Sequence, residues 1–146
     1  MRLTVQTDYA LRMLMHLACN AGALVTIHEI AERYGISKNH LMKVAHELGR
    51  AGFVETIRGR GGGLRLSKPA KAILVGAVAR QTERDSALVE CFPGGRMGCL
   101  VAPCCKLKSV LAEAQEAFFG VLDRYTVYDL VKRNPALLEL LVGDAR

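Results

Sequence analysis

Apolar residues recur every three or four positions near the start of the chain, which is the spacing of one helix face. Leu11, Leu14 and Leu17 form this stripe, and they predict a first helix over residues 8–18. Thr7 stands just before that helix, where its hydroxyl can cap the free backbone N–H groups. The chain is therefore expected to open with an amphipathic helix.

Two more helices follow, with a glycine between them. Thr26 stands three residues ahead of Glu29, the spacing of a capping box, and predicts a short helix over about residues 27–34. Gly35 supplies a tight turn, and Ser37 can cap a third helix whose inner face is apolar. Helix, glycine turn and helix in this order form a helix-turn-helix arrangement.

A glycine-rich hairpin is predicted directly after the third helix. Residues 53–58 and 64–66 have the composition of short strands, and they flank the tip Gly59-Arg60-Gly61-Gly62-Gly63. A hairpin in this position is a wing, and residues 73–82 should form a further helix. We therefore expect residues 1–82 to form a winged helix-turn-helix DNA-binding domain.

The second half of the chain is predicted to hold an irregular loop and a long helix. Residues 83–105 are rich in proline and glycine and should form a loop region that holds the candidate metal ligands. From Lys106 onward, apolar residues alternate steps of four and three, a 3.5-residue repeat that favours a partner helix, although packing on the chain's own domain is the alternative. Thr126 should start a short helix that Pro135 closes. Residues 106–146 are thus predicted to be a dimerisation helix with a short C-terminal helix, and the fold class is mostly α with a small β-hairpin.

Composition and charge narrow the possible partners. The chain has 146 residues, of which 51% are hydrophobic and 23% charged, values typical of a folded soluble protein. It has no apolar run of bilayer length and no signal peptide, so we expect a cytoplasmic protein with no membrane partner. Residues 1–80 hold 12 Lys and Arg against 5 Asp and Glu, whereas residues 81–146 hold 8 against 9. The first half is therefore the candidate surface for a polyanion.

The predicted DNA-binding surface combines the third helix with the wing. Recognition helices usually meet the major groove through their N-terminal half, and bare glycine backbone flanked by guanidinium groups can approach phosphates or a minor groove. We expect contacts to double-stranded promoter DNA from Ser37, Lys38, Asn39, His40, Lys43, Arg58, Arg60, Gly61, Gly62 and Arg65. Met42 is assigned to the core together with Met13 and Met15.

The cysteines indicate a metal centre. An odd count of five in a reducing compartment favours metal binding or redox chemistry over disulfides. Cys91, Cys99 and Cys105 lie in the loop region without a nearby histidine, and their spacing is unlike that of structural zinc sites. Three thiolates suit an iron–sulfur cluster that has an incomplete cysteine set. Because Cys104 adjoins Cys105, either could be the third thiolate.

Five stretches of the chain resemble one known family. They are residues 7–12 (TDYALR), 35–44 (GISKNHLMKV), 54–66 (VETIRGRGGGLRL), 89–92 (VECF) and 121–126 (VLDRYT). They are similar to the NsrR family of nitric-oxide-sensitive bacterial repressors, part of a larger winged-helix family that includes IscR and RirA. The resemblance extends over nearly the whole chain.

The resemblance implies a homodimeric transcriptional repressor that is not an enzyme. It implies an iron–sulfur cluster, 4Fe-4S with 2Fe-2S as the alternative, and release of promoter DNA when nitric oxide nitrosylates the cluster. The implied ligands are Cys91, Cys99, Cys105 and Asp8 of the partner subunit, with Arg12 one helical turn from that carboxylate. On the sequence pattern alone, Asp8 is a favourable charge at the positive end of a helix.

Two other functions stay open at the level of the sequence. The long gap between Cys91 and Cys99 also occurs in iron-responsive regulators of the RirA type, so iron supply is an alternative signal. IscR-like proteins carry a histidine three residues after the last cysteine, and Lys108 stands there in this chain. An iron–sulfur electron-transfer protein is the alternative from another class, although no flavin or nucleotide motif accompanies the cysteines.

Overall fold

The structure is a computed structural model in which residues 2–143 are described. Its elements in chain order are α1 (Val5–Cys19), α2 (Ile27–Tyr34), α3 (Lys38–Arg50), β1 (Val54–Ile57), β2 (Gly63–Leu66), a 3₁₀ turn η1 (Ala70–Ala72), α4 (Val75–Glu83), a second 3₁₀ turn η2 (Ala102–Cys104), α5 (Lys106–Leu122), α6 (Val127–Val131) and α7 (Pro135–Val142). This is the mostly helical fold with one β-hairpin that the sequence predicts.

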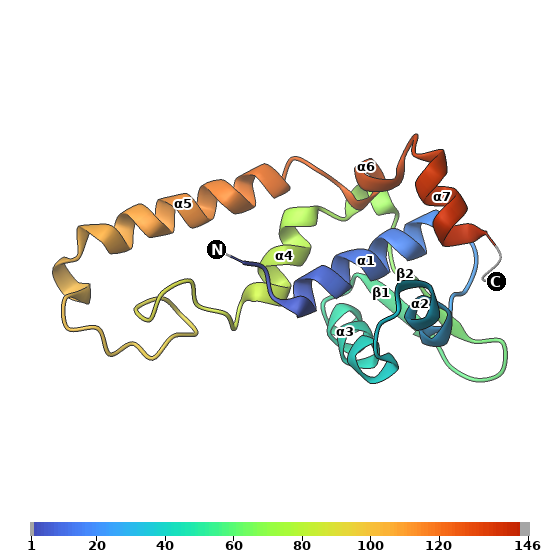
Figure 1. Ribbon diagram of the computed structural model, residues 1–146, viewed down its shortest axis with the longest axis horizontal. Helices are drawn as coiled ribbons and strands as arrows, with labels where there is room; N and C mark the ends of the chain where they lie inside the picture. The colour runs from blue at the N-terminus through green and yellow to red at the C-terminus, as the bar shows by residue number, and fades with distance from the viewer. Residues whose placement is uncertain (1, 144–146) are drawn as a thin grey trace.

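The helices before residue 84, the hairpin, α6 and α7 pack into one body, which we call the head (Figure 1). Within the head α1 is central, and α3, α4, α6 and α7 all contact it. Its residues Ala10, Met13 and Leu14 are fully buried. The long helix α5 and the loop before it project away from the head. The main apolar core therefore belongs to the head.

Helix α1 begins earlier than the apolar pattern indicates. It starts at Val5, and its N-cap is Thr4, whose hydroxyl accepts a hydrogen bond from the N–H of Thr7. The predicted cap, Thr7, is fully buried inside the helix. Its hydroxyl lies 2.7 Å from that of Thr82 and also donates to the carboxylate of Glu83. The prediction of a Thr7 cap was wrong because this hydroxyl is used in contacts with α4.

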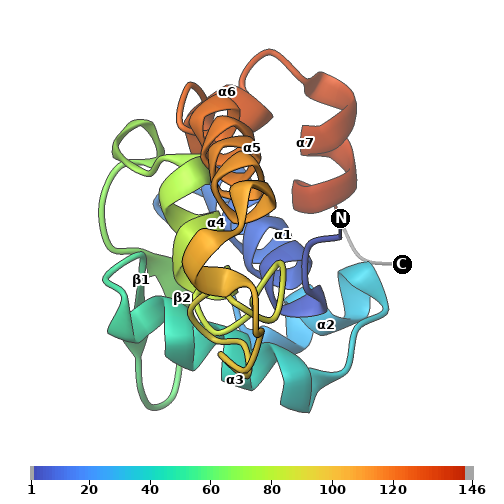
Figure 2. The ribbon, with the colours of Figure 1, turned by 90° about the vertical axis from the view of Figure 1, so that its left-hand side faces the viewer.

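The helix-turn-helix and the wing follow the predicted local signals. Thr26 and Glu29 form both hydrogen bonds of a capping box at the start of α2. Gly35 ends α2 with φ of +64°, a left-handed conformation that glycine adopts without strain. Strands β1 and β2 pair antiparallel, with Val54 opposite Leu66. In Figure 2, α3 and the hairpin lie on the side of the head away from α6 and α7.

The C-terminal part contains a helix that the sequence interpretation missed. Pro135 does not close the chain's last helix; it occupies the first turn of α7, which Asn134 caps by accepting from the N–H of Leu137. Proline fits the first turn of a helix because its missing N–H has no partner there. Helix α7 then packs against α1, and the amide of Asn20 donates to the carbonyl of Leu141.

The joint between the head and α5 lies at the C-terminal end of α5. The N–H of Val75 donates to the carbonyl of Tyr125, and the N–H of Val127 donates to that of Ile73. A Cβ on Gly76 would lie 2.9 Å from the backbone nitrogen of Asp123, so a larger residue would force α4 away from the end of α5. No helix within residues 2–143 is long and apolar enough to span a bilayer.

Candidate DNA interface and thiol loop

Helix α3 separates its apolar and polar sides cleanly. Leu41, Val44, Ala45 and Leu48 are buried against the head. The predicted contact residues Ser37, Lys38, Asn39 and Lys43 are exposed. The hydroxyl of Ser37 accepts from the N–H of His40, which caps the helix as expected. The N-terminal half of α3 thus presents hydrogen-bond donors and positive charge to solvent.

Two residues of α3 are placed differently from the sequence interpretation. His40 is half-buried, and its ring meets the ring of Tyr9 edge-on with centroids 4.8 Å apart. It therefore faces α1 at least as much as solvent. Met42, predicted to fill the core, has 52% of its surface exposed. That prediction was wrong because the four core positions of α3 are already occupied by residues on its other side.

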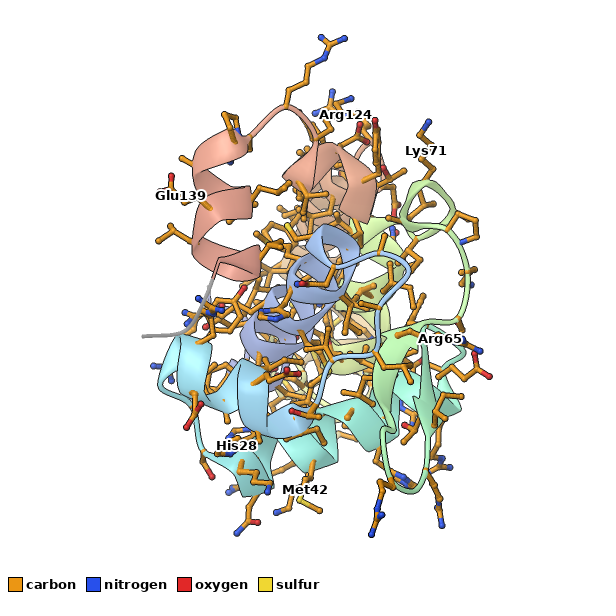
Figure 3. All side chains as sticks on the ribbon, turned by 90° about the vertical axis from the view of Figure 1, so that its right-hand side faces the viewer. His28, Met42, Arg65, Lys71, Arg124 and Glu139 are labelled. Carbon is orange, nitrogen blue, oxygen red and sulfur yellow. The ribbon has the colours of Figure 1, made fainter. Side chains whose placement is uncertain are left out.

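The wing tip is built from glycines in conformations that other residues rarely adopt. Gly59 and Gly61 have φ of +96° and +74°. A Cβ on Gly62 would lie 2.1 Å from the carbonyl oxygen of Ile57, so the tip can close only with glycine there. Arg58 and Arg60 are exposed beside this bare backbone. In Figure 3 the hairpin tip extends toward the same end of the molecule as Met42 on α3.

Arg65 stands apart from the other predicted wing arginines. It lies on β2 opposite Glu55, and its Nε is 2.9 Å from that carboxylate. Figure 3 places it partway along the hairpin rather than at the tip. Its charge is already paired in the chain, so its contribution to a positive surface is smaller than that of Arg58 and Arg60.

The cysteine-bearing loop is irregular, as predicted, and has one apolar anchor. Cys91, Cys99 and Cys105 are partly buried free thiols, whereas Cys104 is exposed. Phe92, next to Cys91, is buried and anchors this part of the loop. The remaining backbone hydrogen bonds within the loop join residues three positions apart, except that the N–H of Met97 donates to the carbonyl of Glu90. The backbone around these thiols is therefore held mainly by local turns.

The donor set fits an iron–sulfur centre by its chemistry but is not gathered at one point. Within residues 2–143, no three His, Cys, Asp or Glu side chains are close enough to hold a metal ion together. Thiolates are the ligands that iron–sulfur clusters use, and three of them lie within fifteen consecutive residues of one loop.

Asp8 lies in the first turn of α1 and forms an ion pair with Arg12. The closest distance is 2.9 Å, and both side chains are about half exposed. The guanidinium of Arg12 also lies 5.9 Å from the ring centre of Tyr9 and 5.8 Å from that of Tyr34. Arg12 thus holds the carboxylate of Asp8 at the surface of the head, as the one-turn spacing suggests.

Two polar contacts that the sequence interpretation did not find connect this region. Glu83, at the end of α4, accepts from the N–H and the hydroxyl of Thr4 at 2.7 and 2.8 Å. Arg80 lies 2.9 Å from Asp123 and 3.1 Å from Glu116, both on or at the end of α5. These contacts join residues 36 or more positions apart, so no local sequence motif predicts them. They fix the start of α1 and the end of α5 to the same helix.

This arrangement defines the class of protein. A helix-turn-helix with a donor-rich, positively charged outer face, followed by an arginine-bearing hairpin at the same end, is the winged helix of DNA-binding proteins. The chain belongs to the Rrf2 family, whose model is described as an iron-dependent transcriptional regulator and matches residues 3–133. It is therefore a DNA-binding transcriptional regulator and not an enzyme.

Similar proteins cover almost the whole chain. The HTH-type transcriptional regulator NsrR of Bacillus subtilis is 52% identical over 142 residues, which are 97% of each chain. The regulator of the same name from Bacillus licheniformis is 51% identical over 97% of this chain and 99% of its own. Among solved structures, T. potens IscR matches with a TM-score of 0.73 at 26% identity, over 100% of this chain and 93% of its own. The oxidized form of Staphylococcus aureus CymR matches with a TM-score of 0.72 at 25% identity, over 92% and 98%.

Proposed function

We propose that the chain is a cytoplasmic, homodimeric repressor that senses nitric oxide through an iron–sulfur cluster. The observation that carries this proposal is the set of three thiols in one loop beside a winged helix, in a chain about half identical to regulators named NsrR. The electron-transfer alternative is not favoured, because these relatives are named transcriptional regulators.

The proposed ligands are Cys91, Cys99, Cys105 and Asp8 of the partner subunit. A bound cluster, 4Fe-4S or 2Fe-2S, supplies iron that reacts with nitric oxide. A carboxylate is a harder ligand than a thiolate and leaves its iron more exchangeable. Arg12 orients that carboxylate from one helical turn away, 2.9 Å from it.

The chain's own residues supply a route from this site to the DNA-binding surface. Glu83 ties the start of α1 to the end of α4, directly before the thiol loop begins. Arg80 ties the same helix to α5, the proposed dimerisation helix. If the ligands in the loop or Asp8 are released, the change is therefore transmitted through α4 to the start of α1 and to the angle between α5 and the head. We infer that this alters the separation of the two recognition helices in the dimer.

Anaerobic purification followed by titration with nitric oxide tests the proposal. We expect a brown protein with iron and sulfide, whose visible absorption changes with nitric oxide in step with loss of promoter binding measured by fluorescence anisotropy. Ser substitutions at Cys91, Cys99 or Cys105 should each lower iron content and abolish the response. Cys104→Ser is the matched control and should retain both. A colourless, iron-free protein that binds its promoter at full strength contradicts the proposal.

Iron supply is the second candidate signal. The family description names iron dependence, which favours this function for the same loop and ligands. The two signals separate in one experiment: promoter binding is followed during nitric oxide addition at constant iron, and during chelation without nitric oxide. Release by chelation alone, with no response to nitric oxide, supports the iron-responsive function.

A further inference from the structure

Helix α3 exposes one large apolar side chain on a surface that is otherwise polar. Met42 is 52% exposed, and it is the one large apolar residue of α3 that is exposed. A single exposed methionine is unremarkable on an ordinary surface. Its position makes it informative, because it lies in the N-terminal half of the recognition helix of a DNA-binding protein.

The neighbours of Met42 face the same way. Met42 follows Lys38 by four residues and Asn39 by three, and it precedes His46 by four, so these side chains lie next to one another on the helix surface. All three neighbours are exposed. In Figure 3 Met42 points away from the head, at the end where the wing tip also lies. Met42 thus lies beside two side chains that are expected to meet DNA, Lys38 and Asn39.

The chemistry of this patch favours DNA over a protein partner. Protein interfaces bury a core of several apolar residues, whereas Met42 is a lone apolar group between positive and amide side chains. Charge complementarity instead fits a polyanion. In the major groove, thymine alone presents an apolar group, its 5-methyl, and apolar side chains contact it. Methionine is flexible and can adjust its thioether to such a group.

We propose that Met42 is a specificity-determining residue that contacts thymine 5-methyl groups in the major groove. This inference rests on the DNA-binding function above, and it goes further by naming the base that the residue at position 42 recognises. Lys38, Asn39 and Lys43 then supply hydrogen bonds to bases or phosphates, while Met42 supplies an apolar contact that no other exposed side chain of α3 offers. Each half-site of the operator should therefore contain a thymine at one fixed position.

Uracil-substituted DNA tests the contact directly, because uracil differs from thymine only by the missing methyl group. A duplex enriched from a random library by the anaerobically purified protein serves as the probe. Each thymine is replaced in turn by uracil, and Kd is measured by anisotropy. We expect about fourfold weaker binding at one position per half-site, the effect of removing one buried methyl group. Met42→Ala should bind the thymine duplex more weakly and lose the response to uracil at that position.

Two control variants separate the contact from general effects. Leu140→Ala removes another exposed apolar side chain, on α7, and should keep both the affinity and the uracil response. Arg60→Ala should weaken binding to thymine and uracil duplexes equally, as expected of a phosphate contact.

Three results bear against the proposal in different ways. A wild-type protein indifferent to every uracil substitution overturns it, as does a Met42→Ala variant that keeps the wild-type uracil response. If no sequence is enriched from the library, the DNA-binding function itself fails and the inference fails with it. Thermal unfolding of each variant checks that the head is intact. The melting temperatures of Met42→Ala and Leu140→Ala should stay close to that of the wild type, because both side chains lie outside the core.

Discussion

At the scale of single residues, Asp8 has two roles, an ion pair within the chain and a proposed ligand role, and substitution can separate them. Within the chain it forms an exposed ion pair with Arg12 and sits at the positive end of α1. Such contacts contribute only about 0.3–1 kcal/mol. As the proposed ligand from the partner subunit, the same carboxylate controls the response to nitric oxide.

Asp8→Ala should therefore change the cluster-free protein little and the loaded protein strongly. We expect the free energy of unfolding in urea, measured without iron, to fall by less than about 1 kcal/mol. In anaerobic preparations, the nitric oxide concentration that releases DNA should shift markedly. Arg12→Ala is the comparison variant, because it removes the same ion pair but keeps the carboxylate, and it should retain more of the wild-type response. An unaltered nitric oxide response and DNA affinity in Asp8→Ala rules the ligand role out.

His16 is a buried histidine on α1 whose Nδ1 has no hydrogen-bond partner among residues 2–143. Burial lowers its pKa, the charge of Arg33 lowers it further, and Glu29 partly opposes the shift. Below pH about 6.5 the unfolded chain binds a proton at this position that the folded chain does not. The free energy of unfolding should therefore fall as pH drops from 6.5 toward the lower pKa of the folded state.

Substitution of His16 should remove this part of the pH dependence. We expect His16→Gln to show a flatter decline of unfolding free energy between pH 7 and 5 than the wild type, in urea titrations at several pH values. The wild-type slope from one histidine is at most about 1.4 kcal/mol per pH unit. Equal slopes in the wild type and His16→Gln contradict the assignment.

At the scale of elements, local signals determine what can be predicted. Helix α2 and the turn after it follow from Thr26, Glu29 and Gly35, which act within their own few residues. The start of α1 cannot be predicted in this way, because the hydroxyl of Thr7 forms hydrogen bonds with Thr82 and Glu83, more than seventy positions away. Such long-range hydrogen bonds leave no periodic trace in the sequence.

Ambiguous residues account for the other errors of interpretation. Proline both ends helices and begins them, and only the cap formed by Asn134 shows that Pro135 begins α7. Methionine occurs both in cores and on surfaces, so the exposure of Met42 follows only from the packing of α3. The candidate ligands could be identified by residue type, whereas the contacts of Arg80 with α5 required the structure.

The wing depends on one glycine for steric reasons. Gly62→Ala would place a Cβ 2.1 Å from the carbonyl oxygen of Ile57, a backbone atom that cannot move without opening the tip. We expect the free energy of unfolding to fall by about 1–3 kcal/mol in urea titrations, together with weaker DNA binding.

A second glycine provides the contrast for this substitution. Gly120 lies inside α5, and a Cβ there would meet no atom within 4 Å. Gly120→Ala should stabilise the protein by up to about 1 kcal/mol, because alanine is the better helix former. If Gly62→Ala is as well tolerated as Gly120→Ala, the steric account of the tip is wrong.

At the scale of the whole molecule, α5 carries an apolar face that the head does not cover. Leu107 is 60% exposed, and Val110 and Val121 are exposed as well. In the proposed dimer this face packs against its equivalent in the second copy. Leu107→Glu should then raise the dimer dissociation constant at least tenfold in sedimentation velocity experiments. Ala112→Glu adds the same charge at another exposed position of α5 and should leave the dimer intact.

Because α5 is fastened to the head at one end, it behaves as a lever. The pivot point is where Gly76 lies against Asp123 and where Arg80 forms ion pairs with Asp123 and Glu116. Seventeen residues of helix give an arm of about 25 Å. A swing of about 10° at the pivot point then displaces the far end by roughly 4 Å, more than the rise of one base pair along DNA. In the proposed dimer, a small adjustment beside α4 would therefore change the spacing of the two recognition helices on the operator.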